Sequence, residues 1–581
     1  MNGLPYILMY LSRPLMPVEE KLGATTALRS SPKVTRRDRP SAAPLEPRWV
    51  SAVTLGMALF AFAVRLFFWY YTRRTWEDAL ITVQHAENAA RGLGLNHDPI
   101  GPHVHGFTSA LSVLIPLLGE WVHRGSGLSL LKFVSAICGG ISVWLAMRIL
   151  RRLGISFPIA LFVGGYLAIE HQQILFGMAG METQIAVAVL LLSIYSLFDL
   201  KPALVGVSLA LCVLARPDFG FFAVLVLGLL GWQCWKMRDW RALETVGFAL
   251  LLICGPWVAF TTWYYGSPLP NTIVAKAWGF GDHWYASPSA AGFLAKLWHR
   301  VQYIFAILGP SYSGNGTGFT RFLFDPHGFI SYIVLLLTLG GCAVTIRSKS
   351  LSGIAIGGFL VIYSFYYLFL VGVIALWYCI PLAAIAVLSA GIGLDAAIHG
   401  FFKGRGRSVA AYAVAIAYLA SFAVIVPETF RGERNVQRFV EDGVRKQVGL
   451  YLAGVERPDQ TIGCEPLGYI GYYSRRVVFA YPGMCNLQVV RFVRQHPRQR
   501  NLLDMLDYFR PDYIALRPLE YKIGLRRGHT WLLSDYQMAA VFRVPEEEKV
   551  QLLFPDQNFD TEFYVLKRTS ALPRTPTSSG R

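Results

Sequence analysis

The chain has 581 residues, of which 54% are hydrophobic and only 15% charged, and its formal net charge is +18. A soluble globular domain has about 25% charged residues, so this composition excludes an ordinary soluble protein. Apolar runs of about 20 residues recur along the chain and predict a polytopic α-helical membrane protein. The chain lacks a basic stripe with interleaved aromatic residues, so no nucleic-acid partner is expected. The excess positive charge is expected in cytoplasmic loops.

Composition divides the chain into three regions. Residues 1–48 are rich in Arg, Pro and Ser and are predicted to form a disordered, basic cytoplasmic tail. Residues 49–427 hold the apolar runs and are predicted to form a transmembrane domain with outer loops at 72–127 and 266–327. Residues 428–581 regain the composition of a soluble protein and are predicted to form an extracytoplasmic α/β domain.

The positive-inside rule orders the apolar runs into about eleven spans, with the N-terminus in the cytoplasm and the C-terminus outside it. The apolar run at residues 110–122 is shorter than the ~20 residues that a span needs, so it is assigned to the outer membrane surface. The expected spans are residues 50–71, 128–147, 155–169, 183–200, 202–215, 219–235, 242–265, 328–346, 352–371, 374–397 and 409–426.

Strand and helix patterns alternate in the C-terminal region. A charged helix is expected at residues 431–453, and strands at 461–465 and 477–481. Residues 505–518 predict a helix, a turn and a strand, and further strands are expected near 539–544 and 563–567.

Cys464 and Cys485 are the only cysteines of this region, and a compartment outside the cytoplasm permits disulfides. Two outcomes stay open: the pair forms a disulfide between the first two strands, or both remain partly buried thiols. The other six cysteines are spread through apolar runs. Without a CxxC or Cys/His cluster, no structural zinc site is expected.

An acidic pair, Glu77 and Asp78, follows the first expected span at the predicted outer membrane surface. Adjacent carboxylates repel each other and are not needed to end a span, so the pair indicates proton chemistry on a membrane-delivered substrate. The alternative is a helix N-terminus, where acidic residues favour the first turn. Successive helix residues point in different directions, so at most one of the two is expected to face a given substrate.

Other polar residues stand at the predicted outer ends of spans. Glu182 is either a substrate-binding residue or a helix cap, and Arg216 either meets a substrate or pairs with an aspartate two residues later. Asn271 and Lys276 open the long outer loop; Lys276 runs against the positive-inside trend, although an interfacial lysine can also snorkel. Arg65 lies inside the first span, where an arginine needs a partner unless it snorkels outward.

The motifs and their order resemble a known family. The stretch WEDALITVQHAENAARGLGLNHDP, followed by VHGFTS, resembles the outer loop of membrane glycosyltransferases of the GT-C superfamily, which begins with Asp-Asp and contains Val-Glu-Gly. GMAGMET, LARPDF and PLPNTIVAK resemble stretches of its mycobacterial arabinofuranosyltransferase branch, and GCEPLGYIGYYSRRVVFAYPGM resembles part of that branch's outer C-terminal domain. The resemblance covers about residues 50–518.

The resemblance implies a GT-C-like transmembrane domain that uses a polyprenyl-phosphate sugar. Glu77 stands for the first aspartate of the family, Gln84 or His85 for a loop arginine, His105 for the glutamate of Val-Glu-Gly, and Ala480 for a strand aspartate. Asp78 or Glu77 is the expected catalytic residue. The residues expected to bind substrate are Lys276, Arg216, Arg65, Glu182, Asn271 and His105.

The sequence therefore predicts an inverting glycosyltransferase of a bacterial plasma membrane. It would move a hexosyl or pentosyl unit from a polyprenyl-phosphate donor to a hydroxyl of a glycan or lipid acceptor on the extracytoplasmic face. The phosphate leaves as a stable anion stabilised by cations, and the acceptor hydroxyl needs a carboxylate base. No metal or other cofactor is expected. The alternatives are a lipid-linked-sugar transporter or flippase without bond-making, and a degenerate relative that acts as a scaffold.

Overall fold

The computed structural model describes residues 47–279, 290–310, 329–348, 350–455, 457–552 and 560–569. The chain divides into two compact units, Met1–Pro47 and Arg48–Arg581, and the elements below belong to the second. The tail predicted at residues 1–48 lies almost entirely outside the described residues, as do parts of the outer loop predicted at 266–327.

Eight helices in the described ranges are long and apolar enough to cross a membrane. They are α1 (Arg48–Thr72), α4 (Gly127–Arg152), η1 with α9 (Pro217–Met237), α10 (Arg241–Tyr265), α14 (Phe329–Arg347), α15 with η3 (Leu351–Leu370), α16 (Leu376–Phe401) and the helix Arg405–Ala453, which begins with α17. The predicted class of helical membrane protein is supported by this set.

A bent pair of helices, α5 (Phe157–Ile169) and α6 (His171–Met178), forms a ninth apolar segment with a 48° break. Glu170 stands at the break and caps α6, because its carboxylate accepts the backbone N–H groups of Gln172 (3.0 Å) and Gln173 (2.7 Å). If the shorter apolar helices α7 (Thr183–Ser196) and α8 (Pro202–Ala215) also cross the membrane, the number of spans is the eleven expected from the sequence. The span count itself stays a prediction.

In the described parts of the two predicted outer loops lie four α-helices and one 3-10 helix. α2 (Glu77–Ala90) and α3 (Ala110–Val122) fall in the first loop, and α3 has the bounds of the short apolar run seen in the sequence. Ser109 caps α3 by accepting the N–H of Ser112. In the second loop, α11 (Asn271–Gly279) follows α10, and α12 (Ala290–Phe305) leads into η2 (Ala306–Leu308).

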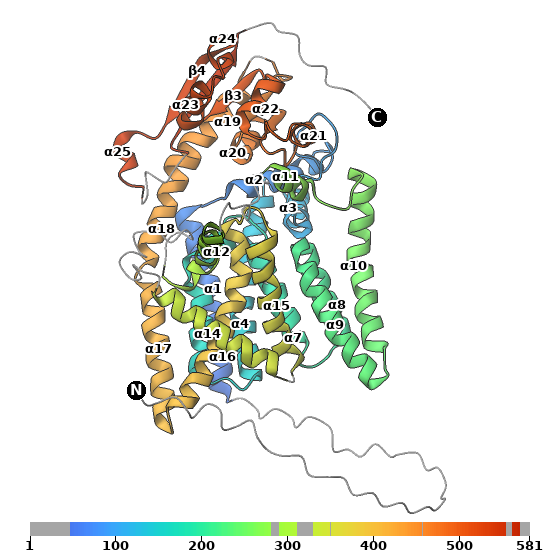
Figure 1. Cartoon of the computed structure of the whole chain (residues 1–581), viewed down its shortest axis with the longest axis vertical. Coiled ribbons are helices and arrows are strands. Elements are labelled where there is room, and N and C mark those ends of the chain that lie inside the picture. Colours follow the sequence, from blue (N-terminus) through green and yellow to red (C-terminus); the bar gives the residue numbers. More distant parts are fainter. Residues whose placement is uncertain are drawn as a thin grey trace, which may run out of the picture. The chain divides into compact units, whose positions relative to one another are not determined.

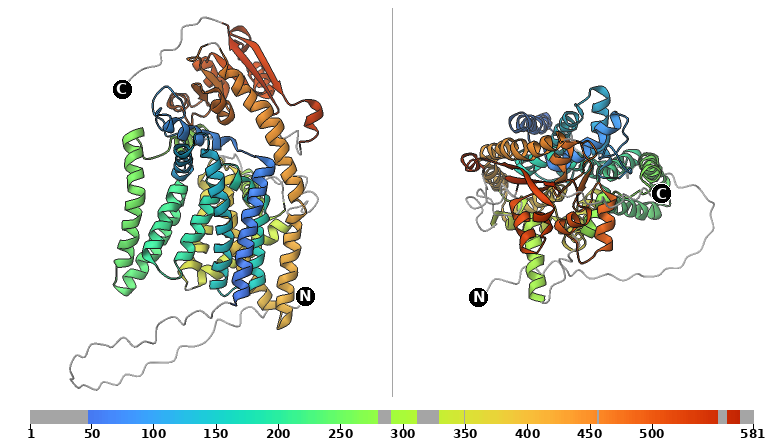
Figure 2. Two further views of the ribbon diagram at one scale, coloured as in Figure 1. Left: turned by 180° about the vertical axis from the view of Figure 1, so that it is seen from behind. Right: turned by 90° about the horizontal axis from the view of Figure 1, so that it is seen from above.

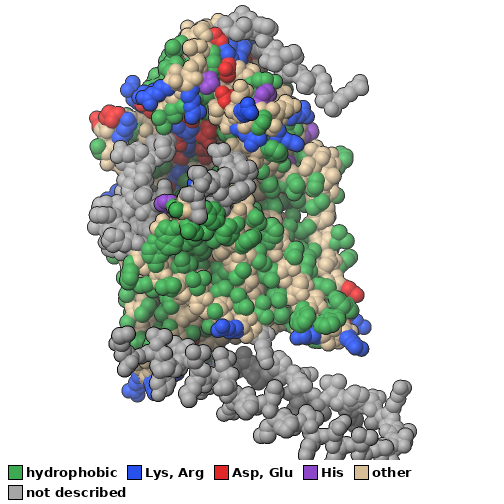
Figure 3. All heavy atoms as spheres, in the orientation of Figure 1, with side chains coloured by type: hydrophobic (Ala, Val, Ile, Leu, Met, Phe, Trp, Pro, Cys, Tyr) green, Lys and Arg blue, Asp and Glu red, His purple; other side chains and the backbone are tan. Residues whose placement is uncertain are grey.

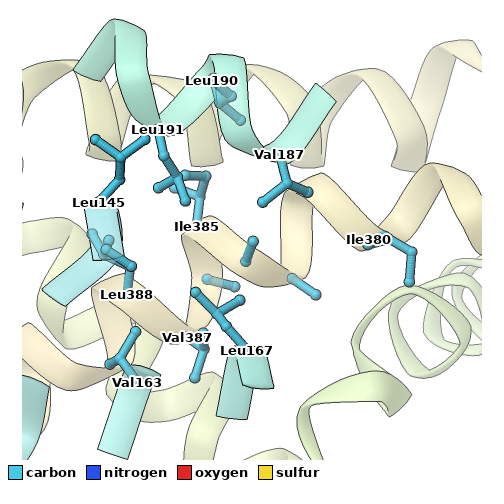
Figure 4. Packing of buried hydrophobic residues seen from close by; sticks show 14 of the residues in the cluster. Leu145, Val163, Leu167, Val187, Leu190, Leu191, Ile380, Ile385, Val387 and Leu388 are labelled. Carbon is cyan, nitrogen blue, oxygen red and sulfur yellow. The ribbon is translucent and has the colours of Figure 1, made fainter. Parts of the chain in front are cut away.

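The buried core of the helical bundle centres on α16, which is apolar on every side, as is typical of an enclosed helix. Figure 4 shows side chains of α4, α5, α7 and α16 meeting in one cluster, among them Leu145, Val163, Leu191 and Leu388. Gly393 lets α14 approach α16 closely, because a Cβ there would collide with the carbonyl oxygen of Leu337.

One long helix joins the bundle to the C-terminal part. It comprises α17 (Arg405–Ala423), α18 (Val426–Asn435), the π-helical η4 (Val436–Arg445) and α19 (Lys446–Ala453), 49 residues in all. Figure 1 and Figure 2 show it running from the helical bundle to the sheet. The sequence predicted a span ending at residue 426 and a separate helix from residue 431. The helix continues because its proline, Pro427, occupies the first turn of α18, a position that proline tolerates.

The described C-terminal part contains a five-stranded mixed sheet with the strand order β2-β1-β3-β5-β4. Its strands are β1 (Ile462–Cys464), β2 (Val478–Ala480), β3 (Tyr513–Leu516), β4 (Tyr536–Arg543) and β5 (Glu562–Arg568). β2, β1 and β3 are parallel, and β5 pairs antiparallel with β3 and β4. The strands predicted from the sequence are confirmed to within a few residues.

Six helices within the described residues connect the strands: α20 (Leu467–Ser474), α21 (Leu487–Gln495), α22 (Leu502–Phe509), α23 (Pro518–Arg526), α24 (Trp531–Ser534) and α25 (Glu546–Lys549). Of the two alternatives for Cys464 and Cys485, the disulfide is not formed: both residues are buried free thiols. The Sγ of Cys464 lies 3.7 Å from the carbonyl oxygen of Pro466, whereas that of Cys485 lies 3.6 Å from the carbonyl oxygen of Gly106. Cys485 therefore packs the C-terminal part against the loop before α3.

The direction of the helices follows from residues that line one shared cavity. Asp78 after α1, Glu182 before α7, Arg216 after α8 and Lys276 after α10 all belong to it. α7 must therefore lead away from this end of the bundle, and α8 must return to it. Figure 3 shows a broad apolar band, with Lys and Arg side chains below it and both acidic and basic side chains above it.

This threading predicts that Gly101 and the C-terminal part lie on one side of the membrane and Arg151 and Lys403 on the other. A reporter that is active only outside the cytoplasm, inserted after Gly101 or after Thr569, should be active. The same reporter after Arg151 or Lys403 should be silent, with protein levels checked by immunoblot. Activity at Arg151 would mean that α3 crosses the membrane and would contradict the threading.

Candidate functional site

A cavity lies between the helical bundle and the sheet, at the level where Figure 1 labels α2 and α11. Its volume is about 630 Å³, counting the space that opens to solvent. Its charged lining residues are Asp78, Glu182, Arg216, Asp218 and Lys276. Four of these five are residues that the sequence singled out, and they come from connections far apart in the chain.

Asp78 occupies the first turn of α2 and lines the cavity. No side chain among the described residues hydrogen-bonds its carboxylate, which leaves both oxygens available to a bound molecule. Burial raises the pKa of Asp78, and the positive charge of Lys276 only partly opposes this rise. A carboxylate with a raised pKa is a stronger base than an ordinary aspartate.

Glu77 turns away from the cavity, toward the C-terminal part. Its carboxylate lies 2.9 Å from the guanidinium of Arg445 and accepts the backbone N–H of Gly468 at 3.4 Å. Position 468 must be glycine for this approach, because a Cβ there would collide with Glu77. The acidic pair thus diverges, as the geometry of a helix predicts.

Burial raises the pKa of Glu77 to about 8, although the nearby Arg445 acts in the opposite direction. Arg445 cannot neutralise Glu77 fully, because its guanidinium also binds the carboxylates of Glu441 and Asp560. Glu77 is therefore a half-buried acid in a shared ionic network rather than a group that faces the cavity.

Two cations form one wall of the cavity. The Nε and Nη2 of Arg216 donate to the two carboxylate oxygens of Asp218, each at 3.0 Å. Its Nη1 lies 3.6 Å from the carboxylate of Glu182 and has no hydrogen-bond partner within the described part of the chain. Arg216 therefore pairs with Asp218, one of the two alternatives that the sequence left open. Its contact with a substrate stays a prediction.

Lys276 forms the rest of this wall with Tyr378. The Lys276 Nζ donates to the Tyr378 hydroxyl at 2.8 Å, and the Tyr378 ring centroid lies 5.5 Å from that nitrogen and 5.1 Å from the Arg216 guanidinium carbon. Burial alone would lower the pKa of Lys276, but Tyr378 and Asp78 outweigh it and raise the pKa. Lys276 is therefore a charged ammonium turned into the cavity, not one that snorkels to the surface.

Hydroxyl groups line the remaining polar surface of the cavity. They belong to Thr82, Thr108, Ser109, Ser112 and Thr272. Thr108 and Thr272 bridge α11 to the loop before α3, with their hydroxyl oxygens 2.9 Å apart.

Burial raises the pKa of Glu182, and the positive charge of Arg216 opposes this rise. Among the described residues, no group of three His, Cys, Asp or Glu side chains is arranged to hold a metal ion.

Three predicted substrate-binding residues do not line this cavity. Arg65 is turned into the bundle, where it donates to the side-chain oxygen of Gln184 at 2.9 Å and to the carbonyl oxygen of Leu167 at 2.9 Å. It neither snorkels nor reaches the cavity. His105 is buried against Tyr265, with ring centroids 4.8 Å apart.

Asn271 is the third of these residues. Its side-chain amide donates to the carbonyl oxygens of Gly483 and Met484, each at 2.9 Å, and so fastens α11 to the C-terminal part. Conversely, the sequence did not single out Asp218 as a cavity residue or Tyr378 at all. The only available signal for Tyr378 was its place at the start of an apolar span.

The apolar helices and the polar cavity at their ends define an integral membrane protein with a site at one end of its bundle. Two solved structures share its fold. ArnT from Cupriavidus metallidurans bound to undecaprenyl phosphate has 13% sequence identity and a TM-score of 0.50, and the similarity covers 91% of this chain and 99% of that chain. The same ArnT in the apo state has 13% sequence identity and a TM-score of 0.50, and that similarity covers 89% of this chain and 97% of the ArnT chain.

At this identity the similarity establishes the fold alone, and it does not single out the arabinofuranosyltransferase branch. Residues 432–564 match a domain of unknown function, DUF8728, which spans the end of the long helix and most of the sheet. No curated protein matches the chain.

The raised pKa of Glu77 predicts a pH-dependent stability. A glutamate with a raised folded-state pKa stabilises the protein fully below its ordinary pKa, and that stability is lost as the pH rises through about 8. The apparent Tm in detergent should therefore fall more steeply between about pH 5 and about pH 8 for the wild type than for Glu77→Gln. The matched control is Glu547→Gln, which changes an exposed glutamate of α25. Parallel Tm curves for wild type and Glu77→Gln would contradict the prediction.

Proposed function

We propose that the protein is an inverting glycosyltransferase that transfers a sugar from a polyprenyl-phosphate donor to an acceptor hydroxyl on the extracytoplasmic face. The observation that carries the proposal is one cavity in which the carboxylate of Asp78 stands with the cations Lys276 and Arg216. The fold shared with a protein crystallised with undecaprenyl phosphate supports the choice of a lipid-linked donor. The motif resemblance to GT-C glycosyltransferases supports the reaction class.

The cationic wall suits the phosphate of the donor. Lys276 supplies a flexible ammonium, and Arg216 supplies its Nη1 group, which Asp218 leaves unused. Charge-assisted hydrogen bonds to phosphate are stronger than neutral ones. Because negative charge on the phosphate grows as the bond to the sugar breaks, these contacts strengthen in the transition state and stabilise the leaving group.

Asp78 suits the role of general base. The acceptor hydroxyl attacks the anomeric carbon, its proton passes to the Asp78 carboxylate, and the bond from that carbon to the phosphate oxygen breaks. Polyprenyl phosphate leaves as a stable anion, so the leaving group needs no proton. A single displacement of this kind inverts the anomeric centre. The hydroxyl-lined surface of Thr82, Thr108 and Ser109 offers hydrogen bonds of the kind that sugars make.

In this proposal the donor carries a hexosyl or pentosyl unit, and the acceptor is a glycan or lipid of the cell envelope. A lipid-linked-sugar transporter would also use Lys276 and Arg216, but it would not need an unpaired carboxylate beside them. Bond-making therefore explains one more feature of the cavity than transport does.

Replacing the proposed base should abolish most of the activity. Asp78→Asn should lower turnover by roughly 10²-fold or more, the lower range for loss of a general base. Glu77→Gln, the neighbouring carboxylate outside the cavity, should lower it far less. The measurement is release of sugar from a polyprenyl-phosphate donor to an acceptor in detergent. Elution volume and Tm check that both variants fold.

Near-normal turnover of Asp78→Asn would remove Asp78 as the base. Equal losses in the two variants would point to damage at the α2 terminus instead of lost proton transfer. Donor binding by the wild type without any sugar release would favour the transporter.

Lys276 should affect both donor affinity and turnover, because its contact strengthens as the phosphate leaves. Lys276→Met should lower turnover by roughly 10²-fold, the scale of losing one preorganised donor at a developing charge. Lys276→Arg should retain part of the activity, since charge survives and geometry changes. Lys201→Met changes an exposed lysine at the opposite end of the bundle and is the matched control. Donor titrations of Lys276→Met that match the wild type would transfer the phosphate contact to Arg216 alone.

A further inference from the structure

A basic surface on α21 takes no part in the cavity. Its members are Arg491 and Arg494 of α21, Arg498 and Arg500 of the following turn, and Trp278 of α11; we call this set the α21 patch. Arg491, Arg494 and Arg498 are exposed, while the other side of α21 is buried through Val489, Val490, Phe492 and Val493. Figure 3 shows Lys and Arg side chains gathered over the region that Figure 1 labels α21.

The arginines of the α21 patch have no acidic partners within the described ranges. None of the four forms an ion pair with another described residue, whereas other arginines of the C-terminal part do so repeatedly. Arg475 binds Glu87, Arg510 binds Asp507 and Asp535, and Arg517 binds three carboxylates. Arg494 and Arg500 both lie over the ring of Trp278, and guanidinium groups so close together without carboxylate partners repel each other, so the surface favours an anionic ligand.

Trp278 places the patch relative to the membrane surface. Its ring centroid lies 5.3 Å from the guanidinium carbon of Arg494 and 5.5 Å from that of Arg500. α11 begins shortly after the end of the candidate span α10, and Leu269 and Ile273 beside it are 59% and 41% exposed. Exposed apolar and Trp side chains just beyond a span are typical of the membrane interface, and the arginines around Trp278 therefore stand at the level of lipid headgroups.

From this geometry we infer that the α21 patch binds the phosphate headgroups of anionic phospholipids in the leaflet on the sheet side of the membrane. Guanidinium groups match phosphate oxygens in geometry and charge, and the indole of Trp278 occupies the boundary between headgroup and acyl chain. The inference does not depend on the proposed reaction.

The contact has a structural consequence for the cavity. α11 carries Lys276 and Trp278, and Asn271 of the same helix donates to the carbonyl oxygens of Gly483 and Met484 just before α21. Lipid headgroups bound across Trp278, Arg494 and Arg500 hold α11 and α21 together at the rim of the cavity. An anionic leaflet thereby stabilises the position of the cavity's lysine.

The test counts lipids bound to the full chain. Protein purified in detergent is mixed with equal amounts of phosphatidylglycerol and phosphatidylcholine of identical acyl chains, and native mass spectrometry measures the ratio of the two lipids retained. The patch variant combines Arg491→Gln, Arg494→Gln and Arg498→Gln. The matched control combines Lys522→Gln, Arg526→Gln and Arg527→Gln, three exposed basic residues on or next to α23. A third variant replaces the three patch arginines by lysine.

The phosphatidylglycerol preference should fall by roughly fivefold for each patch arginine removed, from the ~1 kcal/mol that one basic residue contributes near an anionic surface. The control should match the wild type, and the lysine variant should keep most of the preference. An unchanged preference in the patch variant would overturn the inference. So would equal losses in patch and control variants.

Two further measurements distinguish lipid binding from the binding of soluble anions and from misfolding of the patch variant. Displacement of phosphatidylglycerol by millimolar inorganic phosphate, or by a soluble acidic polysaccharide, would overturn the lipid assignment and identify a site for soluble anions. If the patch variant does not fold, the wild type decides: its phosphatidylglycerol preference should weaken as salt rises, because exposed charges are screened. A preference that does not change with salt would overturn the inference.

Discussion

The arrangement of the molecule around its cavity depends on how Arg445 is neutralised. Its guanidinium binds Glu77 at the start of α2 and Asp560 just before β5. It also binds Glu441, which lies one turn before Arg445 on η4. A buried cation without partners would cost several kcal/mol, so these three parts of the chain must stay together. The network continues through two more arginines: Arg74 binds Glu433 and Glu441, and Arg517 binds Asp560, Glu465 and Glu520.

The same network explains why two adjacent carboxylates tolerate each other. Arg445 draws the Glu77 side chain toward the long helix, and the rotation of about 100° between successive helix residues then turns Asp78 toward the cavity. Glu77 has an ion-pair partner in Arg445, whereas Asp78 forms no ion pair among the described residues. Asp78 is left half-buried, with no hydrogen bond from a described side chain and with Lys276 as its main cationic influence. The π-helical turn η4 contributes by carrying both Glu441 and Arg445 on its wider backbone spiral.

The sequence was most informative where a physical rule acts over short range. Apolar length predicted the long helices, alternation predicted the strands of the sheet, and the rule that successive spans reverse direction brought Asp78, Glu182, Arg216 and Lys276 to one end. Contacts between distant residues could not be predicted in this way. The side-chain oxygen that receives Arg65 belongs to Gln184 on another helix. Likewise, Pro427 predicts a helix break unless it is known to stand in a first turn.

The two helices whose cavity-side ends carry Glu182 and Arg216 are short. α7 and α8 have 14 residues each, which gives about 21 Å of helix against the ~30 Å of a hydrocarbon core. The far end of α7 is level with the far end of α4, since Asp199 and Arg152 form an ion pair of 2.5 Å there.

α7 must therefore stop short at the cavity end. The loop that precedes α7 packs against two neighbours: a Cβ at Gly180 would collide with Leu128 in the first turn of α4 and would crowd Ala79 of α2. Close packing of this loop keeps water from the carboxylates beside it, and burial raises the pKa of both Asp78 and Glu182. The stronger base at Asp78 is thus a result of how the connections at this end of the bundle pack together.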